Sequence, residues 1–235
     1  MGMDLDRSDP TEPHTSSVVD QSVTGLRMLV VQMGGLVIDQ VSSAVHALLQ
    51  HDAALAQLVL AREVQVNEYE RRIDRDSLTF IALQQPVAND LRLARAIVRI
   101  SRELERVGDE AKKIARFALS LAEAPEHAPA VSISRRLRHM ASLSASMLRD
   151  AVRAADEVDV QLAHRVLAQD SELDAEFASA LREVMSYVME DHRFVRPTID
   201  TIFALKGIER VGDHASNIAE QVLYMVGEER QADAA

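Results

Sequence analysis

The chain contains no cysteine and no tryptophan among its 235 residues, and aromatic residues make up only 3% of it. Without cysteine it has neither a disulfide framework nor a thiolate metal site, which suits a reducing cytosol. Any metal must therefore be held by oxygen or nitrogen ligands. Hydrophobic residues at 47% and charged residues at 27% are typical of a globular protein, so its core must be largely aliphatic.

Positive charge is also scarce, because 26 Lys and Arg residues face 37 Asp and Glu residues and give a formal charge of −11. A chain this acidic without a basic stripe repels phosphate backbones, so we expect no nucleic-acid partner. The most apolar early run, 28–38, is too short to cross about 30 Å of hydrocarbon, so we expect no integral membrane protein. Residues 1–17 lack the basic and apolar segments of a signal peptide, and we expect a flexible N-terminal tail there.

Proline occurs only six times and leaves long tracts in which apolar residues recur at helical spacing. These tracts predict six helices, at about 18–50, 53–84, 88–122, 131–155, 158–190 and 197–227. Two prolines within five positions cannot lie inside a helix, so residues 123–130 are expected to be a linker. The sequence therefore predicts an all-α fold.

The segments on either side of this linker repeat each other at an offset of 104 residues. Residues 104–115 and 208–219 are identical at eight of twelve positions, and both contain Glu-Arg-Val-Gly-Asp. A repeat of about 100 residues with three helices predicts two tandem three-helix bundles with short antiparallel connections. We expect these bundles at 18–122 and 131–227, followed by a C-terminal tail at 228–235.

Each half also carries two pairs of carboxylates spaced four residues apart, so each pair shares one helix face. The eight residues are Glu70, Asp74, Glu105 and Asp109 in the first half, and Asp170, Asp174, Glu209 and Asp213 in the second. Carboxylates at this spacing destabilise a helix by about 0.2–0.5 kcal/mol per pair, yet the sequence repeats them at matched places. Four converging carboxylates need a counter-charge, and a hard cation such as Mg, Mn, Ca or Fe is the natural one.

Neighbouring arginines offer a different interpretation, because solvated salt bridges would explain any single acidic pair. Four pairs in two matched sets favour the metal interpretation instead. The chain has no Asp or Glu three residues before a His, as in ferritin-like di-iron bundles, and no glycine-rich phosphate loop, HExxH motif or nucleophile elbow. We therefore expect no enzyme.

The segment Gln85-Pro-Val-Ala-Asn-Asp-Leu-Arg92, with the doubled Glu-Arg-Val-Gly-Asp motif, resembles the PhoU family of phosphate-transport regulators over about residues 20–227. The resemblance implies two three-helix bundles whose Glu/Asp-x-x-x-Asp motifs hold multinuclear iron or zinc clusters in some members. Those motifs fall on the eight carboxylates named above. The sequence departs from the family pattern at Asp170, which replaces a Glu, and the two repeats differ where Lys113 matches Asn217.

The resemblance further implies a non-enzymatic, cytoplasmic negative regulator of the phosphate-starvation response and of phosphate uptake. Such a protein contacts the ATPase subunit of a phosphate-specific ABC transporter and a sensor histidine kinase, and it is at most peripheral to the membrane. We expect a homodimer, since long amphipathic bundles often pair. Bound Fe, Zn, Mn or Mg would fit the motifs. Two other functions stay open: a carboxylate-bridged metal store or metalloenzyme, and a structural helical adaptor whose acidic pairs are solvated.

Overall fold

The structure, a computed structural model, describes residues 15–123, 131–190 and 195–228. It contains α1 (Thr15–Gln50), α2 (Ala53–Gln84), α3 (Ala88–Glu123), α4 (Val131–Glu157), α5 (Val160–Glu190) and α6 (Val195–Met225). The all-α prediction is confirmed, and no predicted helix end differs from the observed one by more than three residues. Residues 1–14 of the expected tail, 124–130 of the expected linker and 229–235 of the expected C-terminal tail lie outside the described residues.

The largest difference is at the N-terminus, where α1 begins at Thr15 rather than at residue 18. The predicted tail was therefore too long by three residues, because Thr and Ser are residue types that favour helix starts as well as loops. α4 runs two residues past its predicted end, and α5 begins two residues late. Val158, in the turn between α4 and α5, has a positive φ of 54°, so neither helix continues through it.

Aspartates begin the second helix of each half in the same way. Asp52 accepts a hydrogen bond from the backbone N–H of Leu55 at 2.9 Å, and Asp159 accepts one from Leu162 at 3.0 Å. A left-handed residue precedes each aspartate, His51 with a φ of 57° in the first half and Val158 in the second. A side-chain cap of this kind satisfies an N–H that the helix leaves unpaired. These caps make the short antiparallel connections possible.

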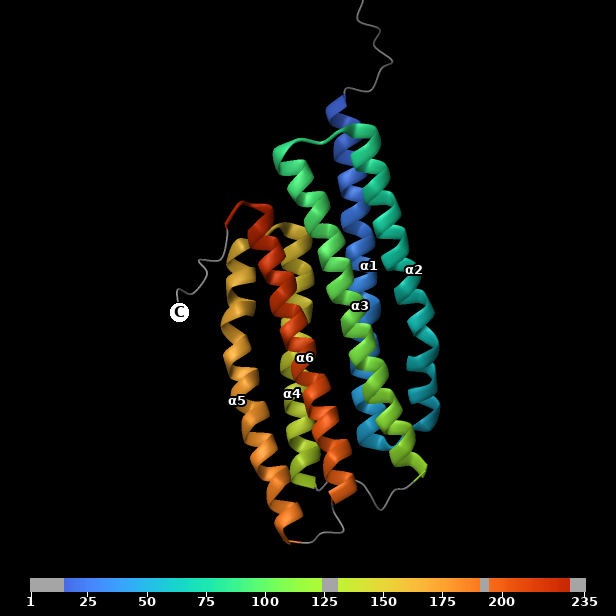
Figure 1. Ribbon diagram of the computed structural model, residues 1–235, viewed down its shortest axis with the longest axis vertical. Helices are drawn as coiled ribbons and strands as arrows, with labels where there is room; N and C mark the ends of the chain where they lie inside the picture. The colour runs from blue at the N-terminus through green and yellow to red at the C-terminus, as the bar shows by residue number, and fades with distance from the viewer. Residues whose placement is uncertain (1–14, 124–130, 191–194, 229–235) are drawn as a thin grey trace, which may run out of the picture.

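The two halves lie side by side as three-helix bundles, with α1–α3 in one and α4–α6 in the other (Figure 1). α3 packs against α6, and α1 packs against α4, so four helices form the contact between the halves. α2 and α5 lie on the two outer sides (Figure 1). Buried aliphatic residues such as Met33, Leu104 and Ile208 fill the core. This arrangement leaves one α2/α3 face and one α5/α6 face, which carry the acidic pairs.

α1 is the most apolar of the helices that the structure describes. Its segment Val19–Gln50 has a mean hydropathy of 1.4 in its most apolar window and is long enough to cross a membrane. Half of that window is buried inside the protein, where Val37, Val41 and Ala44 are almost fully covered. The apolarity of α1 is therefore used in contacts with α2, α3 and α4.

Ring contacts fix both ends of the antiparallel α3–α6 interface. The Arg95 guanidinium donates a hydrogen bond to the Tyr224 hydroxyl at 2.6 Å and lies 5.0 Å from the ring centroid of the same tyrosine. At the other end Phe117 and Phe203 stack with centroids 6.0 Å apart. These contacts hold the two helices in a single register.

Between these ends, two first-half glutamates meet polar groups of the second half. Glu103 accepts hydrogen bonds from His214 Nδ1 at 2.8 Å and from Asn217 Nδ2 at 3.0 Å. Glu110, of which 3% of the side chain is exposed, pairs with Arg210 at 3.0 Å. Burial raises the pKa of Glu103, but its hydrogen bonds outweigh burial and hold that pKa below its ordinary value. The halves are therefore joined by paired, desolvated charges as well as by apolar contacts.

Candidate metal centre

Three of the four predicted carboxylates of the second half converge. Asp174 comes from α5, and Glu209 and Asp213 lie one turn apart on α6, with carboxylate oxygens within 4.8 Å of one another. The fourth, Asp170, accepts a hydrogen bond from Ser216 Oγ at 3.0 Å, and its charge acts on Asp213. We call these four residues the second acidic cluster.

Glu209 is the most buried member of this cluster, with 8% of its side chain exposed. One oxygen, Oε1, accepts a hydrogen bond from Lys206, whereas Oε2 is buried and has no hydrogen-bond partner in the described part of the chain. Burial is the largest influence on Glu209 and raises its pKa above the ordinary value. The hydrogen bond and charge of Lys206 lower that pKa, and the charges of Asp213 and Asp174 raise it. A buried hydrogen-bond acceptor without a partner costs about 1–3 kcal/mol of stability. A positively charged partner for Oε2 would remove this cost.

Asp213 is in the same electrostatic situation, since burial raises its pKa and the charges of Asp170 and Asp174 add to the effect. A surface pocket with a volume of about 390 Å³ lies against Asp170, Asp213 and Ser216. Two members of the second acidic cluster, Asp170 and Asp213, are therefore reached from this pocket.

The first half is arranged differently. Burial raises the pKa of Glu105 on α3, and the charges of Asp109 and Glu70 raise it further. The ammonium of Lys112 lies 2.6 Å from an oxygen of Asp109 and also pairs with Glu63 of α2. This first acidic cluster therefore already contains a positive charge supplied by the chain.

Asp74, the remaining predicted residue, is exposed on α2. Within the ranges that the structure covers, Asp74 belongs to no group of three carboxylates whose oxygens converge. The sequence interpretation also missed Lys112 and Glu63. Lys112 could have been found from the sequence, because it follows Asp109 by three residues and so lies on the same helix face.

Gly212 determines how closely α5 approaches α6. A Cβ at this position would overlap the side chain of Leu173, which is buried in the core. Leu173 precedes Asp174, so this approach also brings the Asp174 carboxylate to α6. The matched Gly108 is less crowded, because its nearest neighbours, Val66 and Gln40, would lie at 3.4 and 3.5 Å from an added Cβ.

The residues of the second acidic cluster fit a hard cation. The donor atoms are carboxylate oxygens from two helices, and one of them is buried without a partner. Oxygen donors suit Mg, Mn, Ca and Fe, and Zn also accepts carboxylates. His214, beside Asp213 in the sequence, directs Nδ1 to Glu103 instead. The first acidic cluster fits a cation less well, because among the described residues no three of its carboxylates converge in this way, and Lys112 pairs with Asp109.

The fold and these clusters define a class of protein: a tandem pair of three-helix bundles in which the second and third helices of each half present carboxylates. A family model for the PhoU domain matches this chain twice, over residues 30–118 and 137–222. The chain belongs to the PhoU family.

Relatives from several bacteria support this assignment. The chain is 40% identical to the phosphate-specific transport system accessory protein PhoU homolog of Pseudomonas aeruginosa, over 93% of this chain and 89% of that protein. It is 35% identical to the phosphate-specific transport system accessory protein PhoU of Escherichia coli, over 91% of this chain and 87% of that one.

Solved structures agree with the fold. The crystal structure of PhoU from Pseudomonas aeruginosa superposes with a TM-score of 0.84 at 40% identity and covers 88% of this chain and 98% of that one. The crystal structure of the phosphate transport system regulatory protein PhoU from Streptococcus pneumoniae superposes with a TM-score of 0.82 at 26% identity, over 90% of this chain and 98% of that one.

Proposed function

We propose that the chain is a cytoplasmic accessory protein of phosphate-specific transport that represses phosphate uptake and the phosphate-starvation response when phosphate is plentiful. The observation that carries this proposal is the similarity, over 93% of the chain, to a protein named as an accessory of the phosphate-specific transport system. Relatives that the chain matches over most of its length are named accessory proteins. This supports a role in binding other proteins.

Its partners are the ATPase subunit of a phosphate-specific ABC transporter and a sensor histidine kinase, which it meets at the inner face of the membrane as a homodimer. Exposed apolar side chains near the end of α2 support a role in protein contacts. Leu78, Leu83 and Val87 expose 61%, 71% and 75% of their surface. Exposed apolar patches of this kind are typical of interaction sites.

The second acidic cluster holds a divalent or trivalent cation, namely Fe, Zn, Mn or Mg. Asp170, Asp174, Glu209 and Asp213 are its ligands, and the buried Oε2 of Glu209 supports this assignment. When bound, the cation supplies positive charge to carboxylates that otherwise repel each other. Glu70, Asp74, Glu105 and Asp109 form a second, weaker candidate set, because Lys112 already pairs with Asp109.

A deletion strain tests the regulatory proposal. In phosphate-rich medium, a reporter of a phosphate-starvation gene is expected to be active in the deletion strain and silent again after complementation with the wild-type chain. A reporter that stays silent in the deletion strain would show that the protein is not a repressor of this response.

Affinity capture from phosphate-replete cells tests the partners. Mass spectrometry is expected to detect the transporter ATPase and the kinase in the captured material. Leu83→Glu and Val87→Glu are each expected to reduce the amount of both proteins. The control Glu172→Gln, on the exposed side of α5, is expected to leave these amounts unchanged. Capture of neither protein would contradict the proposed contacts while leaving the transcriptional result intact.

A further inference from the structure

A pocket with a volume of about 330 Å³ lies between α1 and α4, the first helices of the two halves. None of the eight carboxylates of the acidic clusters lines this pocket, so it is separate from them. The buried side chains of Val41, Val45 and Ala145 line its apolar part. Arg138 and Arg149 line it from α4.

The charge around this pocket is opposite to that of the whole chain. None of the described residues that line it is acidic, although the chain carries a formal charge of −11. Residues 131–149 contain four arginines and no Asp or Glu, and residues 40–50 of α1 contain no acid either. Asp39, Asp52 and Asp150 lie just outside these segments, and Asp150 pairs with Arg153. At physiological salt the Debye length is about 8 Å, so acidic groups beyond that distance are largely screened from the pocket.

The two arginines of the pocket also differ from their neighbours on the same helix. Arg136 pairs with Glu176 and Glu183, and Arg153 pairs with Asp150 at 3.7 Å. Throughout the described ranges, by contrast, Arg138 and Arg149 form no ion pair or hydrogen bond.

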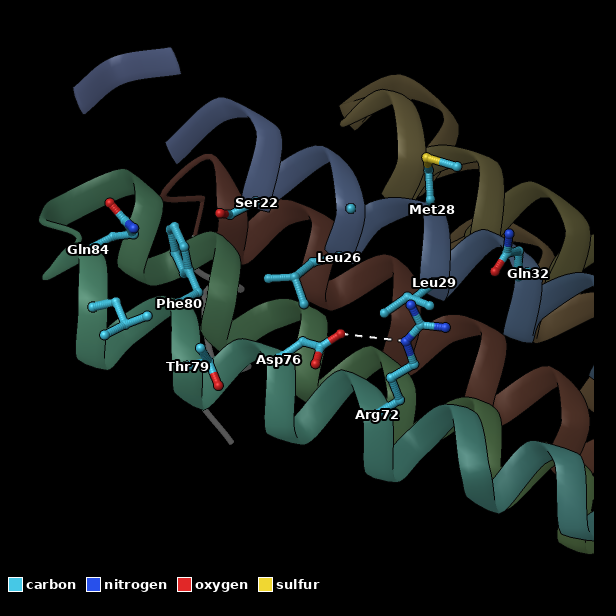
Figure 2. Close-up of a pocket in the computed structure, with 12 residues that line it drawn as sticks. Ser22, Leu26, Met28, Leu29, Gln32, Arg72, Asp76, Thr79, Phe80 and Gln84 are labelled. Carbon is cyan, nitrogen blue, oxygen red and sulfur yellow. Dashed lines mark ion pairs between the residues drawn. The ribbon is translucent and has the colours of Figure 1, made fainter. Parts of the chain in front are cut away.

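A larger pocket between α1 and α2, with a volume of about 480 Å³, provides the comparison. Figure 2 shows that its arginine, Arg72, faces Asp76 across an ion pair of 3.6 Å. That guanidinium is neutralised within the chain. In the pocket between α1 and α4, by contrast, the two lining arginines have no carboxylate partner among the described residues.

The spacing of the two arginines indicates the length of the ligand that could contact both. Eleven residues correspond to three helical turns, which places Arg138 and Arg149 on one face about 16 Å apart along the axis of α4. Ser142 lies between them, and Ser42 and His46 line the pocket from α1. A guanidinium binds phosphate oxygens through two parallel N–H donors, and hydroxyl groups add further donors. The described lining residues include no Phe, Tyr or Trp to stack on a nucleobase, and His46 is their one aromatic ring.

We propose that this pocket binds an elongated soluble anion with two or more phosphate groups, held by Arg138 at one end and Arg149 at the other. A volume of about 330 Å³ lies in the range of small-molecule sites, which is about 300–1,000 Å³. Because its walls come from α1 and α4, the ligand contacts both halves and stabilises their association. The proposal does not depend on the regulatory function or on the metal.

Calorimetric titration of the full chain in 0.15 M salt tests the site with three probes: orthophosphate, tripolyphosphate and ATP. Tripolyphosphate is expected to bind one per chain with a dissociation constant below 1 mM, at least tenfold more tightly than orthophosphate. Equal affinity for ATP supports recognition of the phosphate chain alone. Tighter binding of ATP identifies a phosphorylated metabolite as the source of the anion.

Arg138→Gln and Arg149→Gln are each expected to weaken tripolyphosphate binding at least tenfold. Arg153→Gln is the matched control, since it removes the same charge from the same helix outside the pocket, and it is expected to leave binding unchanged. All three side chains are exposed, so the variants are expected to fold, which circular dichroism checks. Absence of binding by every probe up to 10 mM, or equal weakening by Arg153→Gln, would overturn the proposal.

Discussion

The two halves share a fold and an acidic motif, yet they differ in what meets their carboxylates. At the offset of 104 residues, Lys112 of the first half corresponds to Ser216 of the second. Lys112 bridges Asp109 and Glu63, whereas Ser216 donates a hydrogen bond to Asp170 and brings no charge.

The second partner of this bridge has changed as well. The offset of 100 residues that aligns Glu70 with Asp170 places Ala163 where the first half has Glu63. Both members of the Lys112–Glu63 pair are therefore absent from the second half. The comparison teaches that the same acidic motif is paired differently in the two halves: Lys112 pairs with Asp109 in the first, whereas Lys206 pairs with Glu209 in the second.

The largest expected effect is that only the second acidic cluster responds to a cation. At one hundred times its dissociation constant, a cation stabilises the native state by about 2.7 kcal/mol. Glu209→Gln with Asp213→Asn is expected to abolish this gain and, in chelator, to melt slightly above wild type because repulsion between the pair is relieved. Thermal unfolding with Mg, Mn, Fe and Zn below 1 mM measures both effects.

The matched control is Glu105→Gln with Asp109→Asn, which makes the same changes in the first half and is expected to keep the cation response. If wild type gives no thermal shift with any of the four metals, the carboxylates are solvated and the metal assignment should be dropped.

The glycines of the repeat give the next largest difference. Gly212→Ala is expected to lower stability by about 2 kcal/mol, because the new methyl group displaces the buried Leu173 side chain. Gly108→Ala is expected to be neutral or stabilising by up to about 1 kcal/mol, since its neighbours leave room and alanine favours the helix. Urea unfolding of both variants measures the difference, and equal losses would show that the halves are packed alike around these glycines.

The two halves also differ at their interface, because Glu103 of the first half corresponds to Gly207 of the second at the offset of 104 residues. Glu103→Ala leaves donors of His214 and Asn217 without their acceptor and is expected to cost about 1.5 kcal/mol at pH 7. Glu103→Gln keeps an acceptor and is expected to cost less. Chemical denaturation measures these free energies of unfolding.

The pH dependence of this loss has a definite sign. Because the folded pKa of Glu103 is below its ordinary value of 4.5, the carboxylate stabilises the protein above that pH. Its contribution is lost as the pH falls through the folded pKa. The gap between wild type and Glu103→Ala is therefore expected to shrink as the pH falls below the ordinary value of 4.5. A constant gap would mean that the contact does not depend on ionised Glu103.

The smallest effect is expected from Lys112→Ser, which gives the first half the residue found in the second. In chelator it is expected to cost about 1 kcal/mol, because Asp109 and Glu63 lose a partly buried partner. Made together with Glu209→Gln and Asp213→Asn, it is also expected to create a new cation-induced thermal shift. If no new shift is found, Lys112 is not what closes the first acidic cluster to cations.

The helices could be predicted from the sequence because their signals are local. Six prolines, apolar residues at helical spacing and a repeat offset of 104 lead to six helices without any tertiary information. The predicted helix ends were less accurate where a residue with a positive φ ends the helix. Val158 adopts a positive φ of 54°, which β-branched residues rarely do, so nothing in the sequence indicated a turn at that residue.

The acidic clusters were predictable only in part. The spacing of Asp170, Asp174, Glu209 and Asp213 predicts shared helix faces, and the structure brings the last three together, with Asp170 hydrogen-bonded to Ser216. The same spacing holds for Asp74, which stays exposed, because an i,i+4 pattern does not say which member turns toward the neighbouring helix.

The sequence by itself determined the helical periodicity, the duplication and the positions of the carboxylates, since these depend on residues within a few turns of one another. The tertiary structure alone decided which charges meet. Lys112 reaches Glu63, which is 49 positions away, and His214 reaches Glu103, which is 111 positions away. Such pairs form only after the helices pack, because the energy of two charges depends on their separation and burial in space and not on their distance along the chain.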